Sequence, residues 1–168
     1  MQKGVIIMSD SKINLLIVDD EEQFLESITK SLQVRDFNVI AVNRGEKAIE
    51  AARKNPIDVA LVDLKMPGIN GEETLKALKA EHQWMEVVIL TGHGTIDSAV
   101  ECTRSCAYSY LQKPCSLDEL MESLVNAYKN KVMNKKKIED KKMTELLKIS
   151  LSGSPRDILR RLKEIDKG

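Results

Sequence analysis

Short runs of apolar, mostly β-branched residues recur through the first two thirds of the sequence and alternate with segments of helical periodicity. Four runs and a weaker fifth lie at residues 13–18, 39–42, 59–62, 87–90 and 108–111. Continuous apolar runs are typical of strands buried on both faces, whereas half-exposed strands alternate apolar and polar residues. The runs therefore predict a sheet that helices cover on both sides.

The segments between the runs carry apolar residues at the spacing of a helix. Apolar stripes occupy residues 24–32, 48–52, 75–78 and 117–128. Three capping-box pairs, each a polar residue followed three positions later by glutamate, predict helix starts: Asn43 with Glu46, Asn70 with Glu73, and Ser116 with Glu119. This alternation predicts an α/β fold, in which a parallel sheet of five strands is doubly wound by helices on both faces.

Composition narrows the class of protein. The 168 residues are 42% hydrophobic and 31% charged, which suits one folded domain with an appendage. No run approaches the roughly 18 apolar residues of a membrane span, so we expect a cytoplasmic protein without membrane contact. The three cysteines, at positions 102, 106 and 115, include no C-x-x-C pair, which argues against a disulfide framework or a zinc site.

Charge is unevenly distributed along the chain. Residues 129–168 contain 13 lysines and arginines against 6 aspartates and glutamates, a net charge of +7 that leaves −7 for residues 1–128. Weak apolar spacing beyond residue 128 could extend the last helix, and Ser154, Pro155 and Asp157 have the pattern of a further helix start. A basic helical tail of this kind is more often solvated or protein-binding than nucleic-acid-binding.

Reactive side chains follow the apolar runs at the point where each strand should end. Asp19 and Asp20 follow the first run, Asp63 the third, Thr91 the fourth, and Lys113 lies just beyond the fifth. The carboxyl ends of parallel strands meet at one edge of a sheet, so these side chains should converge there. Clustered carboxylates favour Mg²⁺, and a carboxylate is also a nucleophile toward phosphorus. A lysine and a hydroxyl would neutralise the charge of a transferring phosphoryl group.

Four phrases in this order carry a family resemblance: LIVDDEE at 16–22, VDLKMPG at 62–68, LTGHG at 90–94 and YLQKP at 110–114. They resemble the bacterial response-regulator receiver domain of two-component signalling over about residues 12–130. The resemblance implies a flavodoxin-like (βα)5 fold, which here would carry a helical C-terminal extension. It also implies a cis peptide bond between Lys113 and Pro114.

The resemblance assigns roles to the residues at the strand ends. Asp63 would be the phosphoacceptor, and Asp20, Asp63 and the backbone carbonyl of Lys65 would bind Mg²⁺, with Asp19 holding a metal-bound water. The phosphoryl donor would be a sensor histidine kinase or a phosphotransfer protein. Beyond this transfer to its own Asp63, we expect no enzyme activity, because a phosphohydrolase would need a second carboxylate where Lys65 stands.

The resemblance also implies a switch. Thr91 and Lys113 would contact phosphoryl oxygens, and Tyr110 would turn inward as Thr91 moves, which changes a protein-binding face. The chain departs from the family at residues 106–109, where glycine, alanine and an acidic residue are common, and at Cys115, where an aromatic is usual. These departures leave the phosphoryl chemistry intact and put the shape of the partner-binding face in doubt.

These patterns together predict three segments. Residues 1–11 should be disordered, 12–130 should form the receiver domain, and 131–168 should form a basic helical tail without a recognisable output domain. The main hypothesis is a switch that binds a kinase and then a downstream target protein, with a possible homodimer and no DNA partner. The alternative is a DNA-binding transcriptional regulator whose basic tail is a minimal output element.

Overall fold

The computed structural model describes residues 12–151 and 153–166. Contacts divide the chain into a first unit that ends at Tyr128 and a second unit that starts at Lys129. The segment predicted to be disordered, residues 1–11, lies outside the described residues.

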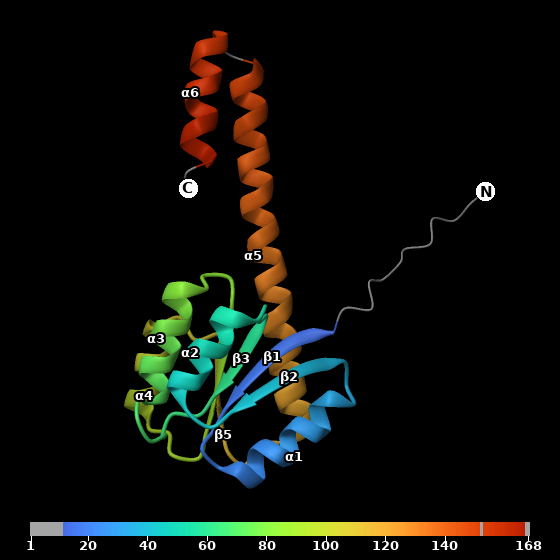
Figure 1. Ribbon diagram of the computed structural model, residues 1–168, viewed down its shortest axis with the longest axis vertical. Coiled ribbons are helices and arrows are strands. Elements are labelled where there is room, and N and C mark those ends of the chain that lie inside the picture. The colour runs from blue at the N-terminus through green and yellow to red at the C-terminus, as the bar shows by residue number, and fades with distance from the viewer. Residues whose placement is uncertain (1–11, 152, 167–168) are drawn as a thin grey trace, which may run out of the picture. The chain divides into compact units, whose positions relative to one another are not determined.

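A parallel sheet of five strands forms the centre of the first unit (Figure 1). Its strands are β1 (Ile13–Val18), β2 (Phe37–Val42), β3 (Val59–Val62), β4 (Glu86–Thr91) and β5 (Ser109–Gln112). They lie in the order β2-β1-β3-β4-β5, so the strand order reverses beside β1. Between and after the strands come α1 (Glu22–Gln33), α2 (Gly45–Lys54), α3 (Gly71–Glu81), α4 (Ile96–Arg104) and α5 (Leu117–Leu151). The prediction of a doubly wound α/β fold with a helical extension is confirmed.

Alternate residues of each strand pack on opposite faces of the sheet. Leu16 and Val18 of β1 belong to one core cluster with buried side chains of α2, α3 and α4, whereas Leu15 and Ile17 belong to another with those of α1 and α5. Figure 1 shows the same division, with α2, α3 and α4 covering one face of the sheet. Burial on both faces explains why the strands appear in the sequence as continuous apolar runs.

The predicted helix starts have mixed outcomes. Asn70 and Glu73 form both bonds of the capping box at the start of α3. Ser116 accepts a hydrogen bond from the Glu119 N–H at 3.1 Å. The prediction for Asn43 and Glu46 is wrong, because α2 begins at Gly45 and the Glu46 carboxylate instead accepts from the Ile69 N–H at 3.1 Å. That contact ties α2 to the loop between β3 and α3.

The second unit contains the distal part of α5 and α6 (Pro155–Asp166). At the start of α6, the Ser154 hydroxyl donates to the Asp157 carboxylate at 2.8 Å and accepts from the Asp157 N–H at 3.4 Å. The sequence therefore predicted this helix and its first turn correctly. Among the described residues, no helix combines the length and apolarity that crossing a membrane requires.

Candidate functional site

The register of the sheet brings the ends of β1 and β3 together. Val18 and Val62 are direct partners in the β1–β3 pair, so Asp19 and Asp63 follow from neighbouring positions. The Asp63 N–H donates to the Val18 carbonyl at 2.9 Å, which fixes the backbone where β3 ends. The sequence prediction that these strand ends converge is thus realised in the backbone.

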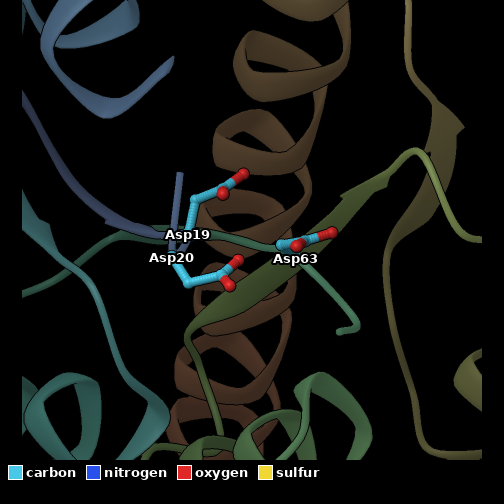
Figure 2. Close-up of side chains that lie close together, drawn as sticks. All are labelled: Asp19, Asp20 and Asp63. Atoms are coloured by element: carbon cyan, nitrogen blue, oxygen red, sulfur yellow. The ribbon is translucent and has the colours of Figure 1, made fainter. Parts of the chain in front are cut away.

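Three carboxylates gather at this edge of the sheet (Figure 2). One oxygen from each of Asp19, Asp20 and Asp63 lies within 4.8 Å of the others. Asp19 and Asp63 are only 2% and 3% exposed, whereas Asp20 is exposed. The Oδ1 atom of Asp63 is buried and has no hydrogen-bond partner among the residues that the structure describes. Hard carboxylate oxygens, one of them left unpaired in a buried position, fit a divalent cation such as Mg²⁺.

Burial is the main influence on Asp63. It raises the pKa of the carboxyl group above its ordinary value, and the negative charge of Asp19 raises it further. Hydrogen bonds from the Thr91 hydroxyl and the Leu64 backbone, together with the Lys113 charge, act in the opposite direction without reversing the shift. The charged form of Asp63 therefore carries a free-energy cost, which a nearby positive charge would reduce.

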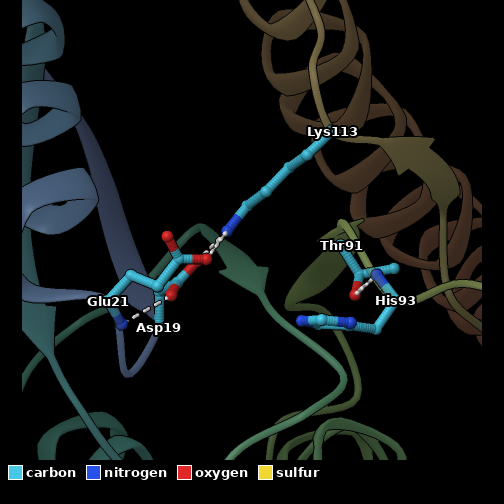
Figure 3. A network of polar contacts seen from close by, with 5 residues as sticks. All are labelled: Asp19, Glu21, Thr91, His93 and Lys113. Atoms are coloured by element: carbon cyan, nitrogen blue, oxygen red, sulfur yellow. Dashed lines mark hydrogen bonds and ion pairs between the residues drawn. The ribbon is translucent and has the colours of Figure 1, made fainter.

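Lys113 reaches the same edge from the residue after β5 (Figure 3). Its Nζ lies 2.6 Å from Oδ2 of Asp19 and 3.4 Å from Oε1 of Glu21. Burial alone would lower the pKa of Lys113, but the hydrogen bond and charge of Asp19 and the charges of Asp63 and Glu21 raise it overall. The ammonium group is thus firmly charged beside the carboxylates. The Lys113–Pro114 peptide bond is cis, as the resemblance implies.

Thr91 and Tyr110 lie on the adjacent strands β4 and β5, where Tyr110 pairs with Ile89, two residues before Thr91. Thr91 ends β4 and is fully buried, and its Oγ1 accepts from the His93 N–H at 3.1 Å. Tyr110 of β5 is half-buried, and its hydroxyl lies 3.1 Å from Oγ of Ser98. A side chain at Gly94 would overlap the Tyr110 hydroxyl, so the glycine makes room for this position of the ring.

Lys65 lies in the loop after β3, two residues beyond Asp63. Its side chain is exposed, and it lines an open pocket of about 590 Å³ together with Asp20, Met66 and His93. Lys65 and Asp20 therefore border one solvent-filled hollow beside the carboxylates.

Sequence reasoning missed three residues that contact the predicted set. Glu21 bonds Lys113, the Phe24 ring lies 4.1 Å from Nζ of Lys113, and Ser98 bonds Tyr110. Phe24 was assigned only to an apolar stripe, because a ring that faces a lysine and a ring that fills a core have the same spacing in sequence. The sequence does contain a signal for Ser98. It lies three residues after the N-cap Thr95, at the position of a capping box.

The fold and the acidic cluster define a flavodoxin-like α/β domain whose polar residues gather at the carboxyl ends of the strands. Comparison with known proteins narrows this class. The family model described as "Response regulator receiver domain" matches residues 15–125. The chain belongs to the response regulator receiver domain family.

Individual relatives agree with this assignment. The chain is 33% identical to the transcriptional regulatory protein ZraR of Klebsiella oxytoca over 71% of this chain and 27% of that protein. It is 31% identical to an NtrX-like response regulator of Rickettsia bellii over 94% of this chain and 33% of that protein. A response regulator receiver domain from Clostridium thermocellum superposes with a TM-score of 0.69 and 31% identity, covering 72% of this chain and 98% of that one. The chain thus spans about a third or less of these curated relatives, whose longer sequences include further segments.

Proposed function

We propose that this domain accepts a phosphoryl group on Asp63 and reports it through a change in its protein-binding surface. The main observation behind this proposal is the Asp63 carboxylate itself. It is buried just after β3, and its Oδ1 atom has no hydrogen-bond partner among the described residues. Two further carboxylates lie within 4.8 Å of this carboxylate, and the Lys113 ammonium lies 2.6 Å from one of them, that of Asp19. Nucleophile, cation-binding oxygens and positive charge are the parts that phosphoryl transfer to a carboxylate requires.

The transfer step conserves atoms and charge. A carboxylate oxygen of Asp63 forms a bond to phosphorus while the bond from phosphorus to the donor's imidazole nitrogen breaks, and the nitrogen retains the electron pair and takes a proton from the solvent. The product is an acyl phosphate on Asp63 and a neutral histidine on the donor. Lys113 would face one phosphoryl oxygen, and the Thr91 hydroxyl would donate to another. The donor would be a sensor histidine kinase or a phosphotransfer protein.

Mg²⁺ is the cofactor that suits this site. Asp20, Asp63 and the carbonyl of Lys65 would bind it, and Asp19 would hold one of its waters. When bound, the ion neutralises charge on the transferring phosphoryl group. The protein's own contribution is to keep three carboxylates within 4.8 Å of each other despite their repulsion.

The readout would pass from Thr91 to Tyr110. Phosphorylation would draw the Thr91 hydroxyl away from its contact with the His93 N–H. The Tyr110 hydroxyl bonds Ser98, whose hydroxyl also caps α4 through the Thr95 N–H at 2.8 Å. Movement of this loop would therefore alter both the start of α4 and the ring of Tyr110, on the face that meets a downstream target.

Mass spectrometry tests the acceptor directly. Wild type incubated with acetyl phosphate and Mg²⁺ should gain one phosphoryl group, and Asp63→Asn should gain none. Asp97→Asn, which removes an exposed carboxylate at the start of α4, is the matched control and should label like wild type. Absence of a labile adduct on wild type, or an equal adduct on Asp63→Asn, would overturn the proposal.

The proposal extends to the domain boundaries of the protein, its location in the cell and the way in which it transmits the signal. Residues 12–130 would be the phosphorylated domain of a cytoplasmic protein, residues 131–168 a basic protein-binding or dimerising tail, and autophosphotransfer to Asp63 the only catalysed step. The name of the relative ZraR and the charge of residues 129–168 favour DNA binding as the second candidate. Retention on DNA that weakens steeply with salt would support that candidate, and retention independent of salt would remove it.

A further inference from the structure

The Lys113 ammonium has contacts on two sides. Carboxylates lie on one side, and an aromatic ring lies on the other. Asp19 and Glu21 hold it from the direction of the carboxylate cluster. The face of the Phe24 ring, whose centroid lies 4.1 Å from Nζ, holds it from α1. That distance is within the range of a cation–π contact, in which the negative face of the ring attracts the charge.

The three contacts differ in how firmly they can hold the lysine. Glu21 is an exposed residue, and its side chain, 62% exposed, is free to exchange its bond with water. Asp19 is buried, but it belongs to the cluster that fits a divalent cation, which would draw on the same negative charge. The Phe24 ring is neutral and cannot bind Mg²⁺. Its attraction for Lys113 is therefore independent of the occupancy of the metal site.

The surroundings of Phe24 explain why the lysine needs such a contact. Phe24 and Lys113 line a hollow of about 560 Å³ together with Pro114, Leu117 and Leu120. A lysine side chain has a flexible stem of four carbons, and this hollow offers it room to leave the site. A ring in the wall of the hollow favours the conformation in which Nζ stays beside the carboxylates.

We propose that Phe24 is a positioning residue for the phosphoryl-transfer reaction, holding the Lys113 ammonium beside Asp63 through the face of its ring. The inference rests on the proposed function, because it gives Lys113 a role toward the phosphoryl group. Phe24 itself touches no reacting atom. Its effect is on the fraction of time that the lysine is in place.

The test separates the ring from the volume that it fills. Phe24→Leu keeps an apolar side chain without a π-face, whereas Phe24→Tyr keeps the ring. Phe37→Leu is the matched control, because Phe37 is the other phenylalanine of the chain, is buried in β2, and packs with α1 and α5 in the same face of the core. Phosphorylation by acetyl phosphate measures the reaction without any contact from a partner protein. Proton NMR of the Lys113 side chain measures the contact, since protons above an aromatic face shift upfield.

Phe24→Leu should slow labelling at saturating Mg²⁺ by about threefold to tenfold, and Phe24→Tyr should stay within about twofold of wild type. The upfield shift of the Lys113 methylene protons should disappear in Phe24→Leu alone. Equal slowing in Phe24→Leu and Phe37→Leu, or a wild-type rate in Phe24→Leu, would overturn the inference. If wild type does not label at all, the proposed function fails, and the NMR shift decides separately whether the ring holds the lysine.

Discussion

The two units of the chain differ in how they use apolar side chains. In the first unit, both faces of the sheet are covered, and large side chains such as Leu16 of β1, Leu61 of β3 and Ile89 of β4 are buried. In the second unit, Ile149 is buried, whereas Met143, Leu151 and Leu159 are 58%, 87% and 59% exposed. Both units contain helices with apolar stripes, so a stripe by itself does not create a core.

The difference follows from what each stripe has to pack against. Helices α1, α2 and α3 and the first part of α5 place their stripes on a sheet, and that burial supplies most of the stability of short helices. In the second unit, the described residues form only the distal part of α5 and α6, without a strand to pack against. Their helicity depends more on intrinsic propensity and on caps such as Ser154. Matched substitutions in the two units should therefore have very different effects.

Core truncation should give the largest contrast. Leu75→Ala, at a fully buried position of α3, should lower the free energy of unfolding by about 2–5 kcal/mol, because it leaves a cavity between α3 and the sheet. Leu159→Ala, at an exposed position of α6, should change it by less than about 0.5 kcal/mol. Urea denaturation followed by circular dichroism measures both. A large loss in Leu159→Ala, accompanied by a change of mass in light scattering, would show that a second copy covers this face.

Helix caps should give the next largest contrast. Asn70→Ala removes the side chain that accepts from the Glu73 N–H at 2.9 Å, and should destabilise the first unit by about 1 kcal/mol. Ser154→Ala removes the corresponding contact in α6 and should reduce helix content without moving the main unfolding transition. Denaturation monitored at two wavelengths distinguishes these results. An equal shift of the main transition would contradict the independence of the two units.

The sequence predicted the parts of the site that depend on chain order alone. Asp19, Asp63 and Thr91 could be placed at one edge because each directly follows or ends an apolar run, and parallel strands share that edge. The five strands, α1, α2, α3 and the start of α6 were found for the same kind of reason. Their patterns are local and have a single simple interpretation.

Features that depend on contacts between distant segments were not predictable. The sequence of helix α4 shows no apolar stripe. Its large apolar residues Ile96 and Val100 are exposed, and the residue that it buries is Cys102. The pairing of Phe24 with Lys113 joins residues 89 positions apart, and the bond from Ile69 to Glu46 displaced a capping box that the sequence favoured. In both cases a tertiary contact determined the position of a side chain that local spacing left open.

Buried charge in the first unit should produce a pH-dependent difference. Folding raises the pKa of Asp63, so the folded protein binds more protons than the unfolded chain between the ordinary carboxyl pKa of 3.8 and the raised value. Stability contributed by this group therefore falls as pH rises through that interval. Without Mg²⁺ at neutral pH, Asp63→Asn should be more stable than wild type by about 1 kcal/mol, and the gain should shrink as pH falls through that interval towards 3.8.

Thermal unfolding in EDTA across this pH range measures the effect. Asp140→Asn, which changes an exposed carboxylate of the second unit, should leave the profile unchanged. Added Mg²⁺ should raise the melting temperature of wild type more than that of Asp63→Asn, because in the proposed site the ion would bind the folded state through Asp63. A wild type more stable than Asp63→Asn in EDTA at neutral pH would mean that burial of this carboxylate has no net free-energy cost.

Backbone conformation at the end of α4 should give the smallest effect. Cys106 has φ 66°, and its neighbour Ala107 donates its N–H to the Cys102 carbonyl at 2.9 Å. This left-handed conformation after a helix favours glycine. Cys106→Gly should therefore stabilise the first unit by about 0.5–1 kcal/mol, as removal of the Cβ strain outweighs the larger entropy of the unfolded glycine. Ala107→Gly is the control. It increases the entropy of the unfolded chain without relieving any strain, so it should lower the free energy of unfolding. A similar decrease in Cys106→Gly would mean that the cysteine side chain stabilises this bend.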